Sequence, residues 1–471
     1  MKVLKFGGSS VASSESIHKV IGIVKGRAAK SNIAVVVSAL GGITDLLLTA
    51  GNLACKGDEN YKDCFKTIEE KHLQIARALI PINSQSSVLG QVKKMLNKLE
   101  TTLEGVFLIN ELSNKTSDKI VSYGELLSSF IISEAIKNNG LDVALKNAQE
   151  LIMTNNNFSN AAVKFDKTNS GIATFFKENK HKIVVLPGFV ASNENGEATT
   201  LGRGGSDYTA AIVASAVDAS ILEIWTDVSG MYTANPQLVK EAFPIKNISY
   251  QEAMELSHFG AKVLYPPTIQ PVLKKEIPIC IKNTFDAQAE GTLITKVSSN
   301  TNPIKGISHI ENMALITLEG SGMVGIPGFS KRLFGALSEQ KINVSLITQA
   351  SSEHSICIAI SNGDVEKAKE AIDQEFSYEM EQQKVDPLSI EKNNAIIALV
   401  GDNMKSHQGI SGKMFSTLGR NNVNIRAIAQ GASEKNISAV ISHKDIKKAL
   451  NALHAAFFED QTKQLNLFVV G

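Results

Sequence analysis

The chain has 471 residues, a formal net charge of +1, and 43% hydrophobic against 20% charged residues. A near-neutral chain without a basic run is atypical of nucleic-acid scaffolds and membrane-surface binders, and no apolar run approaches the ~20 residues that span a bilayer. Four scattered cysteines, without a C-x-x-C pair, indicate reduced thiols rather than a disulfide or zinc framework. The chain also reads into a strand without an apolar leader, so we expect a cytoplasmic protein of about three domains.

The first part of the chain alternates strand-like and helix-like runs. Residues 3–6 precede an amphipathic helical pattern, and Ile33–Val37 is an unbroken apolar run typical of a strand buried on both faces. Further helices are predicted at 43–55, 60–80, 86–105 and 118–139, further strands at 143–145, 183–186 and 221–225, and a hairpin at Asn195-Gly196. This alternation predicts an α/β fold with an open, mostly parallel sheet and helices on both faces. Such sheets bind ligands at the carboxyl ends of their strands.

The last third of the chain contains an internal repeat. Residues 320–356 align without a gap on residues 401–437, at an offset of 81 residues. Each copy predicts a small α+β unit: a strand, a glycine-containing loop, a helix, two strands joined by a tight turn, and a helix. A polar run at 298–303 separates the two parts. The predicted domains are therefore residues 1–298, 304–385 and 386–471.

The two repeat copies share a polar residue at the end of an apolar strand. Gln349 and Gln430 occupy matching positions, where a loop would present them to a ligand. A repeat of this size is either a sensor or a structural pair, and the glutamines favour the sensor. Two such units also predict packing on each other, within one chain or across a dimer.

The stretch KFGGSS, residues 5–10, closes the first strand. One interpretation is structural: Gly7 and Gly8 make the turn, and a serine caps the helix that begins near Ser14. The other is chemical, because bare backbone N–H groups and the ammonium of Lys5 at a helix N-terminus form a phosphate site. The stretch alone leaves both open.

A second glycine-rich stretch, residues 201–207, opens a helix. Capping alone explains Ser206 as the N-cap and Asp207 in the first turn. It leaves Arg203 unexplained, and an arginine beside paired glycines is suited to bind a carboxylate or phosphate through its forked donors. A competing G-x-G-x-x-G match at 320–325 is interpreted as a turn, because its repeat partner lacks the glycines.

Three further stretches are weaker signals. Thr226 and Asp227 follow the strand at 221–225, where a turn explains them equally well. Lys262 lies in a helical pattern, where a lone lysine is usually solvated. Glu125 is predicted to begin an apolar helix, where an acid complements the helix dipole.

Taken in order, these stretches resemble aspartate kinase, of the amino-acid kinase family, over essentially the whole chain. The ordered set is KFGGSSV, VSALGGIT, the Gly124-Glu125 pair, LGRGGSDYTA, WTDVSGMYT and ELSHFGAKVL, followed by two units that resemble ACT domains. The resemblance implies the amino-acid kinase fold and Mg²⁺-ATP-dependent phosphorylation of the side-chain carboxylate of L-aspartate. An anionic acceptor needs no general base, and the resemblance implies that Lys5 instead stabilises the charge on the transferring phosphoryl group. Lys5→Ala is therefore expected to lower kcat far more than it changes the KM for aspartate.

The resemblance also implies roles for individual residues. No metal-ligand set belongs to the protein itself, since Mg²⁺ accompanies ATP. The implied sets are Lys5 and Asp207 for catalysis; Ser38, Thr44, Glu125 and Arg203 for aspartate; Gly7, Gly8, Ser9, Thr226, Asp227, Tyr232 and Lys262 for the nucleotide; and Gln349 and Gln430 for an effector.

The sequence departs from the family pattern at four positions. Asn235 and Gln237 stand where the family usually has aspartate and arginine, so we expect weaker ATP binding or another compensating cation. Tyr265 stands where histidine is frequent, and Ser9 where threonine is frequent.

The paired glutamines resemble the threonine-sensitive bifunctional aspartokinase–homoserine dehydrogenases. In those relatives a dehydrogenase begins where residues 467–471 end this sequence, so we expect the kinase portion of such an enzyme or a free-standing kinase of that lineage. Threonine is the expected effector, and a homodimer or higher homo-oligomer through the ACT units the expected assembly. Two alternatives stay open: a kinase of the same fold with another carboxylate acceptor, and a non-catalytic amino-acid sensor.

Overall fold

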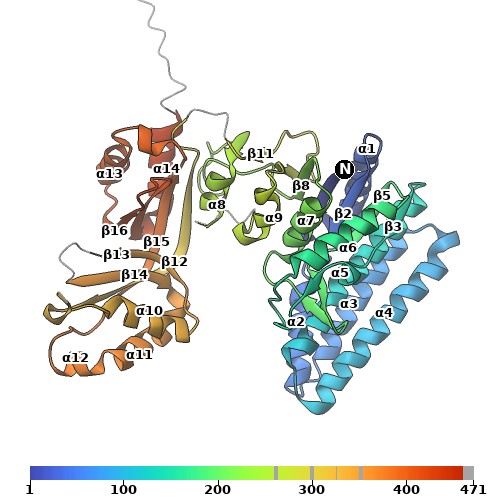
Figure 1. The fold of residues 1–471 in the computed structure, drawn as a ribbon, viewed down its shortest axis with the longest axis horizontal. Coiled ribbons are helices and arrows are strands. Elements are labelled where there is room, and N and C mark those ends of the chain that lie inside the picture. The colour runs from blue at the N-terminus through green and yellow to red at the C-terminus, as the bar shows by residue number, and fades with distance from the viewer. Residues whose placement is uncertain (259–263, 298–301, 325, 350–353, 460–471) are drawn as a thin grey trace, which may run out of the picture. The chain divides into compact units, whose positions relative to one another are not determined.

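A computed structural model describes residues 1–258, 264–297, 302–324, 326–349 and 354–459 (Figure 1). The contacts divide the chain into two compact units. The first contains residues 1–231, 244–250 and 263–299, and the second contains 232–243, 251–262 and 300–471. The second unit thus includes two short segments that precede residue 298. The boundaries at 298, 304 and 386 stay predictions.

The first unit is built on a mostly parallel sheet, as predicted. Its strand order is β3-β5-β2-β1-β8-β10-β11-β9, and only the β10–β11 pair is antiparallel within it. A second, smaller sheet has the order β4-β6-β7 and contains the predicted hairpin. The strands are β1 Lys2–Phe6, β2 Ile33–Val37, β3 Val143–Leu145, β4 Met153–Thr154, β5 Ile183–Pro187, β6 Val190–Asn193, β7 Ala198–Thr200, β8 Ile221–Thr226, β9 Asn247–Ser249, β10 Ile279–Asn283 and β11 Thr292–Thr295.

Helices cover both faces of the main sheet. Leu4 and Phe6 of β1 pack into one core together with apolar residues of α1 to α5, whereas α7 packs against β1, β2 and β8. Because successive side chains of a strand point to opposite faces, Lys5 faces away from the core that contains Leu4 and Phe6. The helices are α1 Ser14–Ala28, α2 Ile43–Cys55, α3 Tyr61–Leu79, α4 Ile82–Ile109, α5 Asn114–Asn138, α6 Phe165–Glu178, α7 Gly205–Ala216 and α9 Gln270–Lys274.

The second unit contains one antiparallel sheet in the order β13-β14-β12-β15-β17-β16. The repeat is confirmed element by element, because β13, β14 and α10 each recur 81 residues later as β16, β17 and α13. The elements are β12 Gly306–Glu319, α10 Phe329–Glu339, β13 Val344–Gln349, β14 Ser355–Ser361, α11 Val365–Glu375, α12 Ser377–Glu381, β15 Ser389–Val400, α13 Ile410–Arg420, β16 Ile425–Gln430, β17 Asn436–Ser442 and α14 Ile446–His454. Helix α8, Tyr250–His258, lies almost entirely in this unit.

Two local predictions are wrong. Ser206 is not the N-cap of α7: the cap is Gly204 at φ +70°, a left-handed conformation that glycine adopts without strain, and no side chain caps the helix. Glu125 does not begin a helix but lies in the middle of α5, so it has no role at a helix terminus. The helical prediction around Lys262 falls outside the described residues.

Gly320 and Gly322 lie in the second unit, after β12, and Gly325 lies outside the described residues. A Cβ added at Gly320 would lie 2.3 Å from the carbonyl oxygen of Lys384. Close packing of the turn therefore accounts for this glycine without a nucleotide.

Candidate active site

Two glycine-containing loops meet at the carboxyl ends of the central strands. Phe6, at the end of β1, pairs with Val37 of β2 and Trp225 of β8. A Cβ added at Gly41 would lie 2.9 Å from the Ala12 Cβ and 3.2 Å from the Gly8 carbonyl oxygen. The loop after β1 and the loop after β2 are therefore in close backbone contact, at the edge of the sheet where α/β folds bind ligands.

Lys5 lies at this edge and reaches the start of α7. Its Nζ lies 2.8 Å from Oδ1 of Asp207, and both side chains are mostly buried. Asp207 is in the first turn of α7, where unpaired N–H groups and the helix dipole favour negative charge. The Lys5 ammonium and the N-terminus of α7 thus lie together, where both can stabilise an anionic group, and the Asp207 carboxylate holds the ammonium in place.

A cavity of about 690 Å³ opens beside this pair. Its lining comes from several parts of the first unit: the end of β1 and the loop after it, the loop after β2 with the start of α2, helix α5, the segment at Ser159, and the segment that enters α7. Among its lining residues are Lys5, Gly8, Ser38, Thr44, Glu125, Arg203, Ser206 and Asp207. The structure therefore brings together both predicted catalytic residues and all four predicted aspartate-binding residues.

Glu125 contributes an acid to the cavity wall. Burial raises the pKa of Glu125 to about 8, against smaller opposing effects of the Ala39 N–H and of Lys5. Its Oε2 is buried and has no hydrogen-bond partner in the described structure. A carboxyl with an unpaired oxygen can accept a hydrogen bond from a ligand ammonium. The positive charge of that ammonium would stabilise the ionised form of Glu125.

Arg203 contributes the opposite charge. Among the described residues no carboxylate lies within 4 Å of its guanidinium, which lies over the Tyr265 ring at 5.5 Å from the ring centroid. The side chain is exposed at the cavity, so its donors are available to a carboxylate or phosphate.

The predicted nucleotide residues are less concentrated. Gly7 donates its N–H to the Trp225 carbonyl oxygen, 3.1 Å away, and a Cβ added there would lie 3.5 Å from Lys5 Nζ. Ser9 belongs to the 3-10 turn Gly8–Val11, and Thr226 ends β8, its hydroxyl donating to Asp227 over 3.1 Å. Of the predicted nucleotide residues, Gly8 lines the cavity. Tyr232 belongs to the second unit, and Lys262 lies outside the described residues.

Two residues of the site were missed as candidates from the sequence. Asp118 lines the cavity seven residues before Glu125, a spacing of about two helical turns that places both acids on one face of α5. Tyr265 was noted only as a departure from the family pattern, although its ring supports Arg203. Helical spacing would have pointed to the first, whereas the second contact joins segments far apart in the chain.

Each repeat copy of the second unit has its own cavity at the predicted glutamine. Gln349 lines a cavity of about 450 Å³ with Phe329 and Ser330, and Gln430 lines one of about 270 Å³ with Ile410 and Ser411. These paired residues again differ by 81 positions. The structure therefore places both glutamines in equivalent cavities.

Two other kinds of feature are absent from the described residues. No helix there is both long and apolar enough to cross a membrane. No cluster of three or more His, Cys, Asp or Glu side chains there is arranged to hold a metal ion. Asp207 lies beside Lys5 in the cleft, where one carboxylate could share Mg²⁺ with the phosphates of a nucleotide.

Comparisons with known proteins agree with this division into two units. The amino acid kinase family model matches residues 1–283, and an ACT domain model matches 316–376 and 397–457. Aspartokinase 1 of Arabidopsis thaliana is 32% identical over 467 residues, which cover 97% of this chain and 80% of that protein. The crystal structure of E. coli aspartokinase III in complex with aspartate and ADP has a TM-score of 0.81 and 30% identity, covering 97% and 100% of the two chains.

This chain belongs to the amino acid kinase family, among the aspartokinases. Bifunctional aspartokinase/homoserine dehydrogenase 1 of Arabidopsis thaliana is 37% identical over 467 residues, 98% of this chain but 51% of that protein. The chain thus spans about half the length of the bifunctional relatives it matches. Its first unit has the amino-acid kinase fold, and the repeat forms its pair of ACT units, as predicted.

The departures from the aspartokinase pattern have local structural consequences. Asn235 accepts the backbone N–H of Gln237 at 3.0 Å, so a turn is kept there without the usual acid. Both residues belong to the second unit, in the segment 232–243. Neither Asn235 nor Gln237 carries a positive charge, so weaker ATP binding, or compensation by another cation, stays a prediction.

Proposed function

We propose that this chain transfers the γ-phosphoryl group of Mg²⁺-ATP to the side-chain carboxylate of L-aspartate, giving 4-phospho-L-aspartate. The observation that carries the proposal is the shared cavity in which Lys5, Asp207, Glu125 and Arg203 meet. The names of the relatives support it, and so does the aspartate and ADP bound to E. coli aspartokinase III.

The two oppositely charged side chains of the cavity suit an α-amino dicarboxylate. Arg203 is proposed to bind the α-carboxylate through its forked donors, and Glu125 the ammonium group. Ser38 and Thr44, on the loop after β2 and the first turn of α2, would donate hydroxyls to the bound aspartate. Binding both ends of the substrate leaves the side-chain carboxylate free to approach the phosphoryl group.

The reaction requires electrostatic help rather than a base. The attacking carboxylate is already ionised, so the barrier comes from the approach of two anions and from charge that develops on the transferring group. Lys5 and the N-terminus of α7 would stabilise this charge, and Asp207 would hold Lys5 in place. Mg²⁺, when bound with ATP, supplies further neutralisation of the phosphates. Alignment of the two reactants supplies the remainder of the acceleration.

The nucleotide is proposed to lie beside the ends of β1 and β8. Gly7 and Gly8 leave room for phosphate near Lys5, and Ser9 adds a hydroxyl to the same turn. Thr226 and Asp227 follow the neighbouring strand. The roles of Tyr232 and Lys262 at the nucleotide are proposed from the resemblance to the aspartokinases alone.

Regulation by an amino acid through the ACT pair belongs to the same proposal. Gln349 and Gln430 line equivalent cavities of a size that suits a small amino acid, and threonine is the proposed effector. Assembly into a homodimer or larger homo-oligomer through the ACT units is proposed as well, and light scattering after size exclusion tests it. A cytoplasmic location stays a prediction.

Hydroxamate trapping tests the reaction and its acceptor together. Purified protein with Mg²⁺-ATP and hydroxylamine should form hydroxamate from L-aspartate, with one ADP released for each acyl phosphate. Glutamate, succinate and N-acetylated acceptors should give little product. Addition of threonine should reduce the rate, and addition of lysine should not. Turnover of another carboxylate in preference to aspartate would support the alternative kinase, and no turnover of any acceptor would support the amino-acid sensor.

A further inference from the structure

The carboxylate of Asp118 joins two segments that meet at the cavity. Only 2% of this residue is exposed. Its Oδ2 accepts the backbone N–H of Ser159 at 2.8 Å and of Thr200 at 3.0 Å, and its Oδ1 accepts the Thr200 hydroxyl at 2.8 Å. Among the described residues no lysine, arginine or histidine forms an ion pair with it, so hydrogen bonds from Thr200 and Ser159, that of the Ser159 side chain included, compensate its burial.

The two segments that Asp118 joins, around Thr200 and around Ser159, both lie next to the backbone of Arg203. Thr200 precedes Arg203 by three residues, and Gly202 between them has a φ of +71°. A Cβ added at Gly202 would lie 2.7 Å from Oδ1 of Asn160, the residue after Ser159. The N–H of Ala161 also donates to the Thr200 carbonyl oxygen, at 2.9 Å. The segment around Ser159 therefore packs directly against the loop that contains Arg203.

Ser159 has an unfavourable backbone conformation. Its φ of +73° lies in the left-handed region, which residues other than glycine, asparagine and aspartate rarely adopt. Such a conformation persists where the surroundings hold it. The hydrogen bond from the Ser159 N–H to Asp118 is one such restraint, and it acts at the point where the segment faces the cavity.

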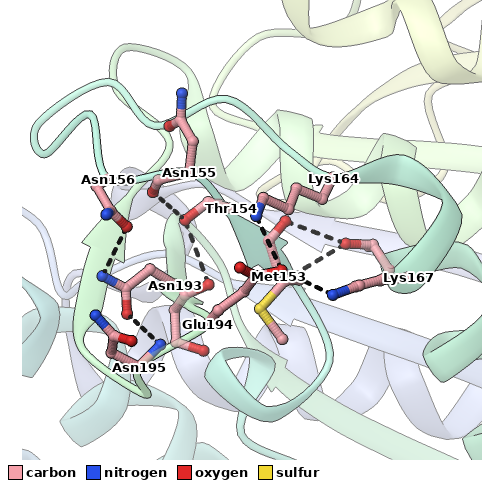
Figure 2. Close-up of polar contacts among 11 residues, drawn as sticks. Met153, Thr154, Asn155, Asn156, Lys164, Lys167, Asn193, Glu194 and Asn195 are labelled. Carbon is pink, nitrogen blue, oxygen red and sulfur yellow. Dashed lines mark hydrogen bonds and ion pairs between the residues drawn. The ribbon is translucent and has the colours of Figure 1, made fainter.

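The same segment is anchored at its other side by the smaller sheet. Figure 2 shows Asn193 of β6 donating to Asn156, with Nδ2 and Oδ1 3.1 Å apart. The Oδ1 of Asn155 accepts the N–H of Ala162 at 2.9 Å, which closes the segment into a loop. The β6–β7 hairpin thus fixes one side of this loop, and Asp118 fixes the side that supports Arg203.

We propose that Asp118 is a positioning residue that sets recognition of the substrate α-carboxylate by fixing the loop of Arg203. Helix α5 then controls both ends of the amino acid, because Glu125 lies seven residues further along the same face. The Ser128 hydroxyl extends this row by donating to the Ser38 carbonyl oxygen at 2.8 Å. The inference rests on the proposed function, since it assigns Arg203 to aspartate.

The test compares aspartate with its α-amide, isoasparagine, which keeps the side-chain carboxylate. In Asp118→Asn the ratio of kcat/KM for the two acceptors is expected to fall at least tenfold, toward the ratio of Arg203→Ala, while the KM for ATP stays within about twofold. In an Arg203→Ala background, Asp118→Asn should cause no further loss of this ratio. An unchanged ratio in the folded variant, or an equal rise in the KM for ATP, would overturn the proposal.

Two further comparisons separate positioning from general stability. Thr200→Val removes one of the donors to Asp118 and should lower the ratio, whereas Thr200→Ser keeps the hydroxyl and should restore it, even where Asp118→Asn fails to fold. Glu194→Gln is the matched control, because Glu194 is an exposed carboxylate paired with Lys164 and Lys167 (Figure 2), and its loss should leave the ratio unchanged. A Thr200→Val protein with the wild-type ratio, or a Glu194→Gln protein with a lowered one, contradicts the proposal.

Failure of the proposed function gives a different result. If the wild-type protein forms no acyl phosphate from aspartate, the proposed reaction is wrong. Calorimetry without nucleotide then tests the positioning role of Asp118, through the ratio of the dissociation constants for aspartate and isoasparagine. A ratio that falls in Asp118→Asn supports the positioning role, and equal ratios in the two proteins overturn it.

Discussion

Lys5 and Asp207 stand 202 positions apart in the sequence, yet Lys5 Nζ lies 2.8 Å from Asp207 Oδ1 at the end of the central strand. Their side chains are only 11% and 14% exposed, so this is not a solvated surface pair. Removing one member of such a pair leaves the other charge without compensation, which is more costly than the pair itself is stabilising. The orientation of Lys5 therefore depends on Asp207.

Asp207→Asn is expected to lower kcat by about 10²-fold or more, because Lys5 is no longer held toward the transferring phosphoryl group. Adding Asp207→Asn to Lys5→Ala should cause little additional loss, since Asp207 acts through Lys5. Steady-state kinetics of the two single variants and the double variant measure this coupling. Fully additive losses would show that the two residues act separately.

The pH dependence of aspartate use should report Glu125. Its pKa of about 8 means that the carboxyl is largely protonated at pH 6.5 in the free protein, whereas a substrate ammonium favours the ionised form. We expect kcat/KM for aspartate to rise about tenfold between pH 6.5 and 8.5 and then level off. Glu125→Gln should abolish this rise. A flat profile in the wild-type protein contradicts the assignment.

The same shift has a consequence for stability. Because the pKa of Glu125 in the folded protein lies above its usual 4.5, the folded state retains a proton that the unfolded chain releases. The stability associated with this group is full below pH 4.5 and is lost as the pH rises through 8. Urea unfolding of Glu125→Gln should therefore show a weaker decline in stability over this range than the wild-type protein does.

Because of His72, the stability of the folded protein should decline as the pH falls, which is opposite to the effect of Glu125. His72 is fully buried in α3, its Nδ1 lies 2.6 Å from the Ile68 carbonyl oxygen, and burial lowers its pKa from 6.5 to about 4. The unfolded chain therefore binds more protons between pH 4 and 6.5, and the folded state loses stability as the pH falls through this range. The loss from pH 7 to 5 is about 2 kcal/mol. His72→Gln should remove most of this slope in urea unfolding, and an unchanged slope would exclude His72 as its source.

Effector binding should depend on the matching glutamines. Gln349→Ala and Gln430→Ala are each expected to raise the threonine concentration for half-inhibition at least tenfold, because each removes a polar group from one cavity. The kcat without threonine should stay within about twofold of the wild-type value. Calorimetry with threonine should show the same loss of affinity, and normal binding in both variants contradicts the effector assignment.

Local patterns predicted most of the secondary structure. The apolar run Ile33–Val37 is a strand with every residue buried, and the helix predicted at 60–80 spans Tyr61–Leu79. The repeat was predictable because matching residues recur in the sequence at a fixed offset of 81 positions. The ends of elements were less certain: Gly204, rather than Ser206, caps α7, since its left-handed conformation replaces a side-chain cap.

The roles at the site were predictable only where a motif preserved them. Lys5 and Arg203 belong to glycine-rich stretches that are visible in the sequence. Asp118 and Tyr265 act through contacts between distant segments, the first with Ser159 and the second with Arg203. Helical spacing marks Asp118 as lying on the same face of α5 as Glu125, but no local pattern encodes its contact with Ser159 or that of Tyr265 with Arg203.

Phosphorus NMR of the wild-type protein and of Lys5→Ala, each with Mg²⁺-ATP and L-aspartate, shows whether Lys5 is needed to form the acyl phosphate. We expect an acyl-phosphate signal that grows with ADP in the wild-type sample, and a rate at least 10³-fold lower in Lys5→Ala with a KM for aspartate within a few-fold of the wild-type value. An acyl phosphate formed at the wild-type rate by Lys5→Ala would contradict this expectation.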